Sequence, residues 1–255
     1  MEIGVAKPSR AELSSIPHYF INSHSIQEEV NAALFERLAL PWTEEIFRER
    51  DIAIMVGGTG LYIRAFCEGL DEMPVVDPSL RKEIQSRYEQ EGIGWLREEI
   101  RIHDPHFYRT GEIQNPQRLM RALEVKLATG KPISSFRSSR KKTRDFQIRK
   151  IGLRLDKETL YRRIDRRVEQ MIDSGLLPEV RALGPFRRLN ALQTVGYTEL
   201  FSFLDGEISL DQAIDLIKKN TRKYAKRQLT WFARDQEIRW LDPADPKIHE
   251  KLTQA

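Results

Sequence analysis

The sequence predicts an α/β fold with a helix-rich segment inserted into its core. Three observations predict it: three short apolar runs typical of strands, amphipathic helical stretches between and after them, and a segment from about Val76 to Asp145 with helical features and no strand. The 255 residues suffice for one large domain or for a core with one insertion. We therefore assign residues 1–75 and 147–255 to the α/β core and 76–146 to the helical insertion.

Three apolar runs are expected to form the strands of the core. The first, Asp51–Val56, ends in Gly57 and Gly58 and is followed by helical periodicity, which is typical of a buried parallel strand that leads into a helix. The other two are Phe146–Leu155 and Ile238–Leu241. Strands separated by helices pair in parallel in α/β folds, so a parallel sheet is expected.

Three helices have recognisable ends. The first, 115–130, opens with an asparagine cap and a proline at the first helical position and ends in a glycine. The second, 156–175, opens with an aspartate, carries an apolar stripe and ends near a glycine. The third is long and spans about 210–233. The basic, serine-bearing stretch 137–144 is expected to be a solvated loop.

Composition excludes several classes of protein. Lys and Arg number 42 against 38 Asp and Glu, so the net charge of +4 does not by itself indicate an anionic partner. A single cysteine, Cys67, excludes an internal disulfide framework, and no pattern of histidine and cysteine predicts a metal site. No apolar run approaches the ~18 residues of a membrane span, and none resembles a secretory signal. We expect a soluble, cytoplasmic protein.

The sharpest local feature is the loop Gly57–Gly60 after the first expected strand. Its glycines allow the backbone to approach a ligand closely, and the following helix N-terminus favours an anion or a polarised atom. Thr59 adds a hydroxyl at this position. The alternative is a tight turn without a ligand, and because the spacing matches neither a Walker loop nor a dinucleotide fingerprint, both interpretations stay open.

The long C-terminal helix carries an unmixed basic face. No acidic residue occurs from Leu216 to Arg234. The basic side chains form two rows at i+4 spacing: Lys218, Arg222 and Lys226, and Lys219, Lys223 and Arg227. A solvated helix usually mixes charge signs, so this face favours a polyanion such as a nucleic acid, and an ordinary solvated face is the alternative. Trp231 is expected to belong to the core, because tryptophan side chains more often lie there than on a surface where bases stack.

Two further polar clusters lie on expected helices. Arg163 and Arg167 are one turn apart and can clamp a phosphate, or they can pair with Asp165, Glu169 or another surface carboxylate. The second cluster is a polar face that opens the 115–130 helix and consists of Gln117, Arg118 and Arg121.

Five sequence blocks, in this order, resemble the tRNA dimethylallyltransferase family, also called tRNA isopentenyltransferases. The blocks are Glu2–Ser9, Val56–Tyr62, Asn115–Val125, Val195–Leu200 and Thr221–Phe232. The resemblance covers essentially the whole chain. It implies a P-loop-NTPase-like parallel-sheet core with a helical insertion. It also implies transfer of a dimethylallyl group from dimethylallyl diphosphate to N6 of the adenine immediately 3′ of the anticodon, with Mg²⁺ assisting departure of diphosphate.

The resemblance assigns roles to individual positions. Thr59 is expected at the acceptor adenine, near the point of attack, and Arg163 and Arg167 at the diphosphate. The expected tRNA-contacting residues are Arg81, Gln117, Arg118, Arg121, Gln193, Thr194, Val195, Gly196, Tyr197, Thr198, Lys226, Arg227, Gln228, Thr230 and Trp231. The implied partners are a tRNA anticodon stem-loop and dimethylallyl diphosphate, and the protein is expected to be a monomer.

Two small departures from the family pattern each remove a possible phosphate contact. Thr198 stands where Arg or Lys is commoner, and Ala233 stands where Arg is usual, although Arg234 can compensate.

A larger departure concerns the phosphate loop. Family members carry a further N-terminal segment with a Gly-rich phosphate loop and an aspartate general base, and no GxxxxGK[ST] pattern occurs in this sequence. We expect the first core strand, the diphosphate cradle and the usual Mg²⁺ anchor to be absent, and activity to be impaired. The sequence is then a piece of a normal enzyme, through truncation or a misassigned start, or a naturally shortened, inactive relative.

Two other functions remain as alternatives. One is a tRNA-binding remnant without catalysis, and the other is an isopentenyltransferase that acts on free adenine nucleotides. The basic face of the long helix and the Gln117–Arg121 face favour a polynucleotide over a free nucleotide.

Overall fold

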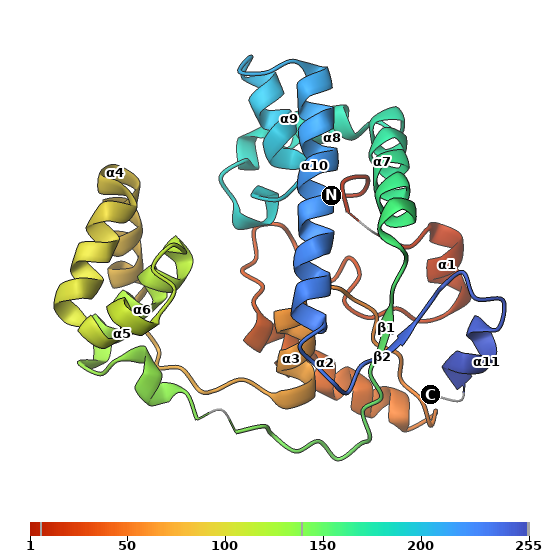
Figure 1. Ribbon diagram of the computed structural model, residues 1–255, viewed down its shortest axis with the longest axis horizontal. Coiled ribbons are helices and arrows are strands. Elements are labelled where there is room, and N and C mark those ends of the chain that lie inside the picture. Colours follow the sequence, from red (N-terminus) through yellow and green to blue (C-terminus); the bar gives the residue numbers. More distant parts are fainter. Residues whose placement is uncertain (6, 139, 254–255) are drawn as a thin grey trace. The chain divides into compact units, whose positions relative to one another are not determined.

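The computed structural model describes residues 1–5, 7–138 and 140–253 (Figure 1). Ala6 of the opening block and Ser139 of the expected basic loop lie outside the described residues. The chain forms two compact units, one made of Met1–Cys67 with Arg144–Ala255 and the other of Glu68–Thr143. The sequence placed the insertion at 76–146, within which the helices of the second unit fall.

The second unit is helical. Its elements are α4 (Pro78–His103), α5 (Pro105–Thr110), α6 (Pro116–Thr129) and the 3₁₀ turn η1 (Ile133–Phe136). The predicted 115–130 helix is confirmed as α6: the Asn115 side chain accepts from the amides of its first turn, and Gly130 closes it at φ 70°. Leu119, Ala122, Leu123 and Val125 of α6 are fully buried in the core that α6 forms with α4, whereas Leu127 near the end of α6 is exposed. Helix α4 bends at Gly92, where φ is 75°.

The first unit is also mostly helical. Its helices are α1 (Arg10–Ser15), α2 (Ala32–Phe47), α3 (Gly60–Glu68, whose last residue belongs to the second unit), α7 (Lys157–Asp173), α8 (Leu176–Ala182), α9 (Tyr197–Leu204), α10 (Leu210–Phe232) and α11 (Ile248–Thr253), with 3₁₀ turns η2 (Gly184–Phe186) and η3 (Asn190–Leu192). The predicted helices 156–175 and 210–233 are confirmed as α7 and α10. Asp156 caps α7 by accepting from the Thr159 amide at 2.9 Å, and Ser209 forms a capping box with Gln212 at the start of α10. In the described part of the chain, no helix is long and apolar enough to cross a membrane.

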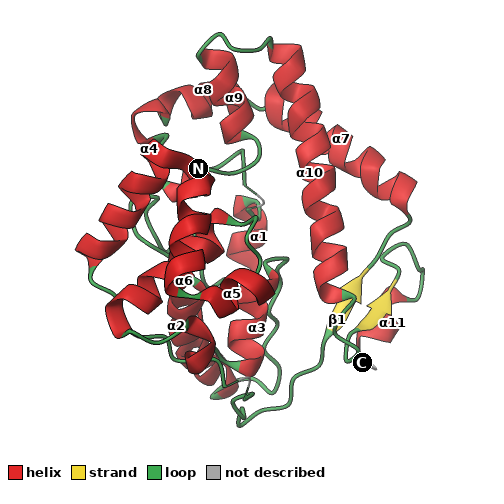
Figure 2. Ribbon diagram, turned by 60° about the vertical axis from the view of Figure 1, so that its left-hand side comes forward, coloured by secondary structure: helices red, strands yellow, loops and turns green. Residues whose placement is uncertain are grey.

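The sheet is small and parallel. Strands β1 (Ile151–Leu153) and β2 (Arg239–Leu241) pair in register, Ile151 with Arg239 and Leu153 with Leu241 (Figure 2). Both lie inside predicted strands, and α7 to α10 form the connection between them. The predicted α/β class is confirmed, with a smaller sheet than the sequence indicated.

The prediction of a strand at Asp51–Val56 is wrong. The segment has no regular secondary structure, and its apolar side chains are open to solvent, with Ile54 83% and Val56 90% exposed. A buried parallel strand needs hydrogen-bonded neighbours and helices that cover its faces. Among the described residues only β1 and β2 pair, so this segment has no neighbouring strand.

The core of the first unit includes a polar anchor. Tyr197 is fully buried and donates its hydroxyl to the Glu179 carboxylate at 2.6 Å. The same carboxylate accepts from the backbone amides of Glu2, Ile3 and Gly4 at 2.7, 2.9 and 3.1 Å. Burial alone would raise the pKa of Glu179, but these hydrogen bonds outweigh it and hold the pKa at about 2. One carboxylate thus attaches the opening segment of the chain to α8 and α9.

This anchor predicts a pH-dependent contribution to stability. Since the pKa of Glu179 is about 2 in the folded protein against an ordinary 4.5, the carboxylate stabilises the fold fully above pH 4.5, and this contribution disappears as the pH falls toward 2. We expect Glu179→Gln to lower the free energy of unfolding at neutral pH by about 1–2 kcal/mol, allowing for solvent screening of the partly exposed carboxylate.

The measurement is denaturant unfolding of the protein, the variant and the exposed control Glu44→Gln across this pH range. Glu179→Gln should flatten the dependence of the unfolding free energy on pH, and the control should not. An unchanged slope in the variant would contradict the proposed anchor.

Candidate functional site

The glycine loop forms the start of helix α3. The Thr59 carbonyl accepts the amides of Tyr62 at 2.9 Å and of Ile63 at 3.2 Å, so the helical hydrogen bonds begin at this residue. The Thr59 side chain is exposed. The Tyr62 hydroxyl donates to the Val30 carbonyl at 3.0 Å and attaches α3 to the segment before α2. The threonine therefore stands at a helix N-terminus with its hydroxyl accessible to a ligand.

Two side chains of helix α10 also contact this loop. The Gln228 amide nitrogen donates to the Gly58 carbonyl at 3.0 Å. The Trp231 ring lies beside Gly60 and is 37% exposed, so it is neither a fully buried core residue nor a fully open stacking surface. Residues 170 positions apart in the chain are thus brought together at Thr59.

The two arginines of the predicted phosphate clamp are exposed on α7. Neither Arg163 nor Arg167 forms an ion pair with another described residue. The carboxylates that the sequence offered as partners are engaged elsewhere: Asp165 accepts both arms of Arg222 on α10, with the Nε contact at 3.0 Å, and Glu169 accepts Lys218 at 2.6 Å. Figure 1 shows α7 beside α10, which these two ion pairs join. Of the alternatives open for this cluster, pairing with Asp165 or Glu169 is not found.

The basic face of α10 is narrower than the sequence predicted. Lys218 and Arg222 are committed to α7. The remaining four basic side chains are exposed; they are Lys219, Lys223, Lys226 and Arg227. The guanidinium of Arg227 lies over the Tyr224 ring, 5.4 Å from its centroid. A continuous cationic strip therefore remains along the exposed side of the helix.

The predicted tRNA-contacting loop 193–198 divides into an exposed and a buried part. Gln193 and Thr194 are exposed, and Val195 is half-buried. The Tyr197 side chain belongs to the core, as described above, so RNA cannot contact this side chain directly in this structure. Gly196 is buried at φ 98°, a conformation that favours glycine.

A buried glutamate fixes this loop. Glu199 Oε2 accepts the Gly196 amide at 2.8 Å and the Thr198 hydroxyl at 3.0 Å. Its other oxygen accepts the Asn220 side-chain amide of α10 at 2.8 Å. Sequence reasoning missed Glu199 and Asn220. The glutamate stands three residues after Gly196, which is capping-box spacing and could have indicated it.

The candidate residues of the second unit lie at the starts of α4 and α6. Arg81 and Arg121 both reach the buried carboxylate of Glu124, at 3.3 and 3.1 Å. Arg118 pairs with Glu112 at 2.6 Å, and Gln117 is exposed. Glu124 was not foreseen; it holds two of the predicted tRNA-contacting arginines together on one surface.

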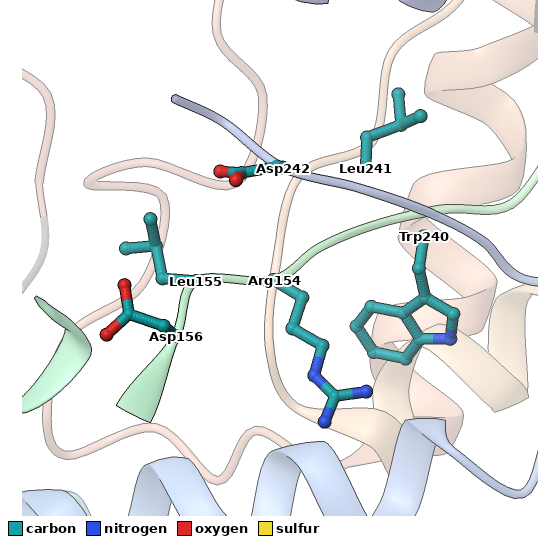
Figure 3. Close-up of a pocket in the computed structure, with 6 residues that line it drawn as sticks. All are labelled: Arg154, Leu155, Asp156, Trp240, Leu241 and Asp242. Carbon is teal, nitrogen blue, oxygen red and sulfur yellow. The ribbon is translucent and has the colours of Figure 1, made fainter. Parts of the chain in front are cut away.

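An open hollow of about 330 Å³ lies at the carboxyl ends of the two strands (Figure 3). Its lining comes from the residues just after β1 and from the end of β2; they are Arg154, Leu155, Asp156, Trp240, Leu241 and Asp242. None of the residues predicted from the sequence lines this hollow. The Asp156 carboxylate is already used as the cap of α7.

The described residues contain no cluster of three or more candidate metal ligands. No group of three His, Cys, Asp or Glu side chains in that part of the chain could hold a metal ion. Mg²⁺ is usually held by one or two carboxylates together with substrate phosphates and waters, so the Mg²⁺ that the resemblance implies does not need such a group, and no step below is assigned to it.

Comparison with known proteins gives consistent matches. The model of the family described as IPP transferase matches residues 1–235. A protein of Christiangramia forsetii named tRNA dimethylallyltransferase is 48% identical over 242 residues, which cover 95% of this chain and 80% of that relative. A relative of the same name from Cytophaga hutchinsonii is 44% identical over 245 residues, covering 96% and 81%.

Solved structures agree with this. A tRNA isopentenylpyrophosphate transferase from Bacillus halodurans is 33% identical with a TM-score of 0.68, covering all of this chain and 80% of that one. A eukaryotic dimethylallyltransferase, described as acting on tRNA, is 26% identical with a TM-score of 0.73, covering 94% of this chain and 63% of that one.

The Glu199 network predicts a specific loss of order. We expect Glu199→Ala to lower the free energy of unfolding by about 2–4 kcal/mol, because a buried carboxylate and its three hydrogen bonds are removed together. Hydrogen exchange at the Gly196 amide should accelerate, since its acceptor is lost. The exposed Glu207→Ala is the control and should change neither quantity. Equal effects of the two variants would show that Glu199 does not hold the loop.

Proposed function

Because the chain belongs to the IPP transferase family, we propose that it transfers a dimethylallyl group from dimethylallyl diphosphate to N6 of the adenine immediately 3′ of a tRNA anticodon. The names of the relatives and the description of the eukaryotic structure as acting on tRNA support this reaction. The structural match to the Bacillus halodurans enzyme, which covers all of this chain, supports the same fold for the site. We place the protein in the cytoplasm, as a monomer, with the anticodon stem-loop and dimethylallyl diphosphate as its partners.

The proposed reaction is a group transfer with a simple balance. The adenine N6 attacks C1 of the dimethylallyl group, and a C–N bond forms. The C–O bond to the diphosphate breaks, and the leaving group departs with the electron pair. N6 then loses one proton. The site must therefore hold an adenine taken out of its stack beside a departing polyanion.

The observation that carries the proposal is the arrangement of charge on α7. Asp165 and Glu169 form ion pairs with α10, so they do not neutralise the exposed guanidiniums of Arg163 and Arg167, which can bind a ligand. Two arginines one helical turn apart suit the oxygens of a diphosphate, whose negative charge grows as it leaves. The exposed cations of α10 and the arginines around Glu124 supply the sequence-independent attraction to an RNA backbone.

Transfer of radiolabel from dimethylallyl diphosphate to an anticodon stem-loop tests the reaction. We expect Thr59→Ala to slow transfer by about 100-fold with stem-loop affinity within about twofold, because the hydroxyl acts at the reacting atoms. Thr59→Ser keeps the hydroxyl and should keep most of the rate. Equal losses of rate and of affinity in Thr59→Ala would contradict this role of Thr59.

The same assay separates the two other functions. Adenosine monophosphate that accepts the group as well as the stem-loop does would establish the free-nucleotide enzyme instead. Stem-loop binding without turnover, with affinity that falls by a log–log salt slope of about −0.7 to −0.9 per phosphate contact, would establish a non-catalytic tRNA-binding protein.

The arginine clamp predicts a separate effect. We expect Arg163→Ala to raise the KM for dimethylallyl diphosphate by about tenfold or more, because a charge-assisted hydrogen bond to the diphosphate is lost, and to leave stem-loop affinity nearly unchanged. The control is Arg162→Ala, since Arg162 lies about 100° round the helix from Arg163 and contacts Thr159. A loss confined to RNA affinity would show that Arg163 contacts the nucleic acid.

A further inference from the structure

Two glycines of the loop before α3, Gly58 and Gly60, lie against side chains of α10. A Cβ at Gly58 would lie 2.1 Å from the Gln228 amide nitrogen, and a Cβ at Gly60 would lie 2.2 Å from the Trp231 indole nitrogen. Both distances are far shorter than a van der Waals contact. The loop backbone therefore lies against side chains of α10 at two points. A Cβ at Gly58 would displace the end of the flexible Gln228 side chain, and a Cβ at Gly60 would collide with the Trp231 ring.

The two points of contact flank Thr59. Gln228 and Trp231 are separated by three positions, so they share one face of α10. Their targets, Gly58 and Gly60, are the chain neighbours of Thr59 on either side. At the first point the contact is also a hydrogen bond, from Gln228 to the Gly58 carbonyl at 3.0 Å. The backbone on both sides of the threonine is thus held by a single rigid element.

We propose that Gln228 and Trp231 are positioning residues, which hold the loop so that the Thr59 hydroxyl stays directed at the acceptor. This inference rests on the role of Thr59 in the proposed function. The alternative is that both side chains contact tRNA directly, as the resemblance implied. For Gln228 the structure favours positioning, because its side-chain nitrogen donates to Gly58 at 3.0 Å and the residue is partly buried. For Trp231 the argument is the close approach of its ring to Gly60.

The first test replaces only the hydrogen-bond donor. Gln228→Glu keeps the shape of the side chain but sets a carboxylate oxygen against the Gly58 carbonyl. We expect kcat to fall by about tenfold, with the Kd for the stem-loop and the KM for dimethylallyl diphosphate within about twofold. The control is Gln236→Glu, the same change at an exposed residue with no side-chain hydrogen bond in the described structure. Affinity for the stem-loop that falls as much as kcat does, and more than in the control, would overturn the proposal.

A second test uses the steric contact. Gly58→Ala forces the Gln228 amide out of the position from which it donates, so this variant should slow transfer as Gln228→Ala does. The double variant should then be no slower than the slower single variant, since both changes remove one interaction. Losses that multiply in the double variant would show that the two residues act independently.

Hydrogen exchange tests the proposed positioning role without a measurement of turnover. The amides of Tyr62 and Ile63 donate to the Thr59 carbonyl and report the order of the loop. Their exchange should accelerate in Gln228→Glu and stay unchanged in Gln236→Glu. If the unaltered protein shows no transfer, the proposed reaction fails while these exchange rates still decide whether α10 holds the loop. Unchanged exchange in Gln228→Glu would overturn the positioning role.

Discussion

The ion pairs between α7 and α10 fix the geometry on which the rest of the site depends. Arg222 binds Asp165 through both arms and Lys218 binds Glu169, so the register of one helix against the other is set at two successive turns. Partly exposed ion pairs contribute little stability, about 0–1 kcal/mol each, so their main effect here is on position. Asp165 and Glu169 on α7 are engaged while Arg163 and Arg167 stay available. Helix α10 is held where Asn220 meets Glu199 of α9 and Gln228 meets the glycine loop.

Local signals predicted helices α6, α7 and α10 well, and two of the three expected strands contain β1 and β2, but the prediction of the remaining strand is wrong. The ends of α6 and α7 are specified by nearby residues, such as Asn115 and Gly130, and these helices begin and end where the sequence predicts. A strand depends on neighbours that no local pattern specifies. The apolar run Asp51–Val56 has the composition of a buried strand, yet nothing in the described residues pairs with it.

The candidate site shows the same division between local and long-range information. The sequence could propose Thr59 and the arginines of α7 as site residues, because the motifs that contain them are local. It did not foresee that Tyr197 is buried, because its partner, Glu179, is eighteen residues earlier on another helix. Nor could it assign Gln228 to the glycine loop, which lies 170 residues away. A side chain that positions another part of the protein, and does not bind a ligand itself, has no local sequence motif that reveals this role.

Helix α10 makes several different contacts along its 23 residues, and this limits which insertions and deletions the helix can tolerate. Each contact needs its residue at a set angle around the helix axis: Ile217 toward the core, Arg222 toward α7, and Gln228 toward the glycine loop. One inserted residue between Arg222 and Gln228 turns everything beyond it by about 100° and shifts it by about 1.5 Å. Substitutions on the exposed cationic side leave that phase intact. The length of the helix between these contacts is therefore more tightly constrained than the identity of its exposed residues.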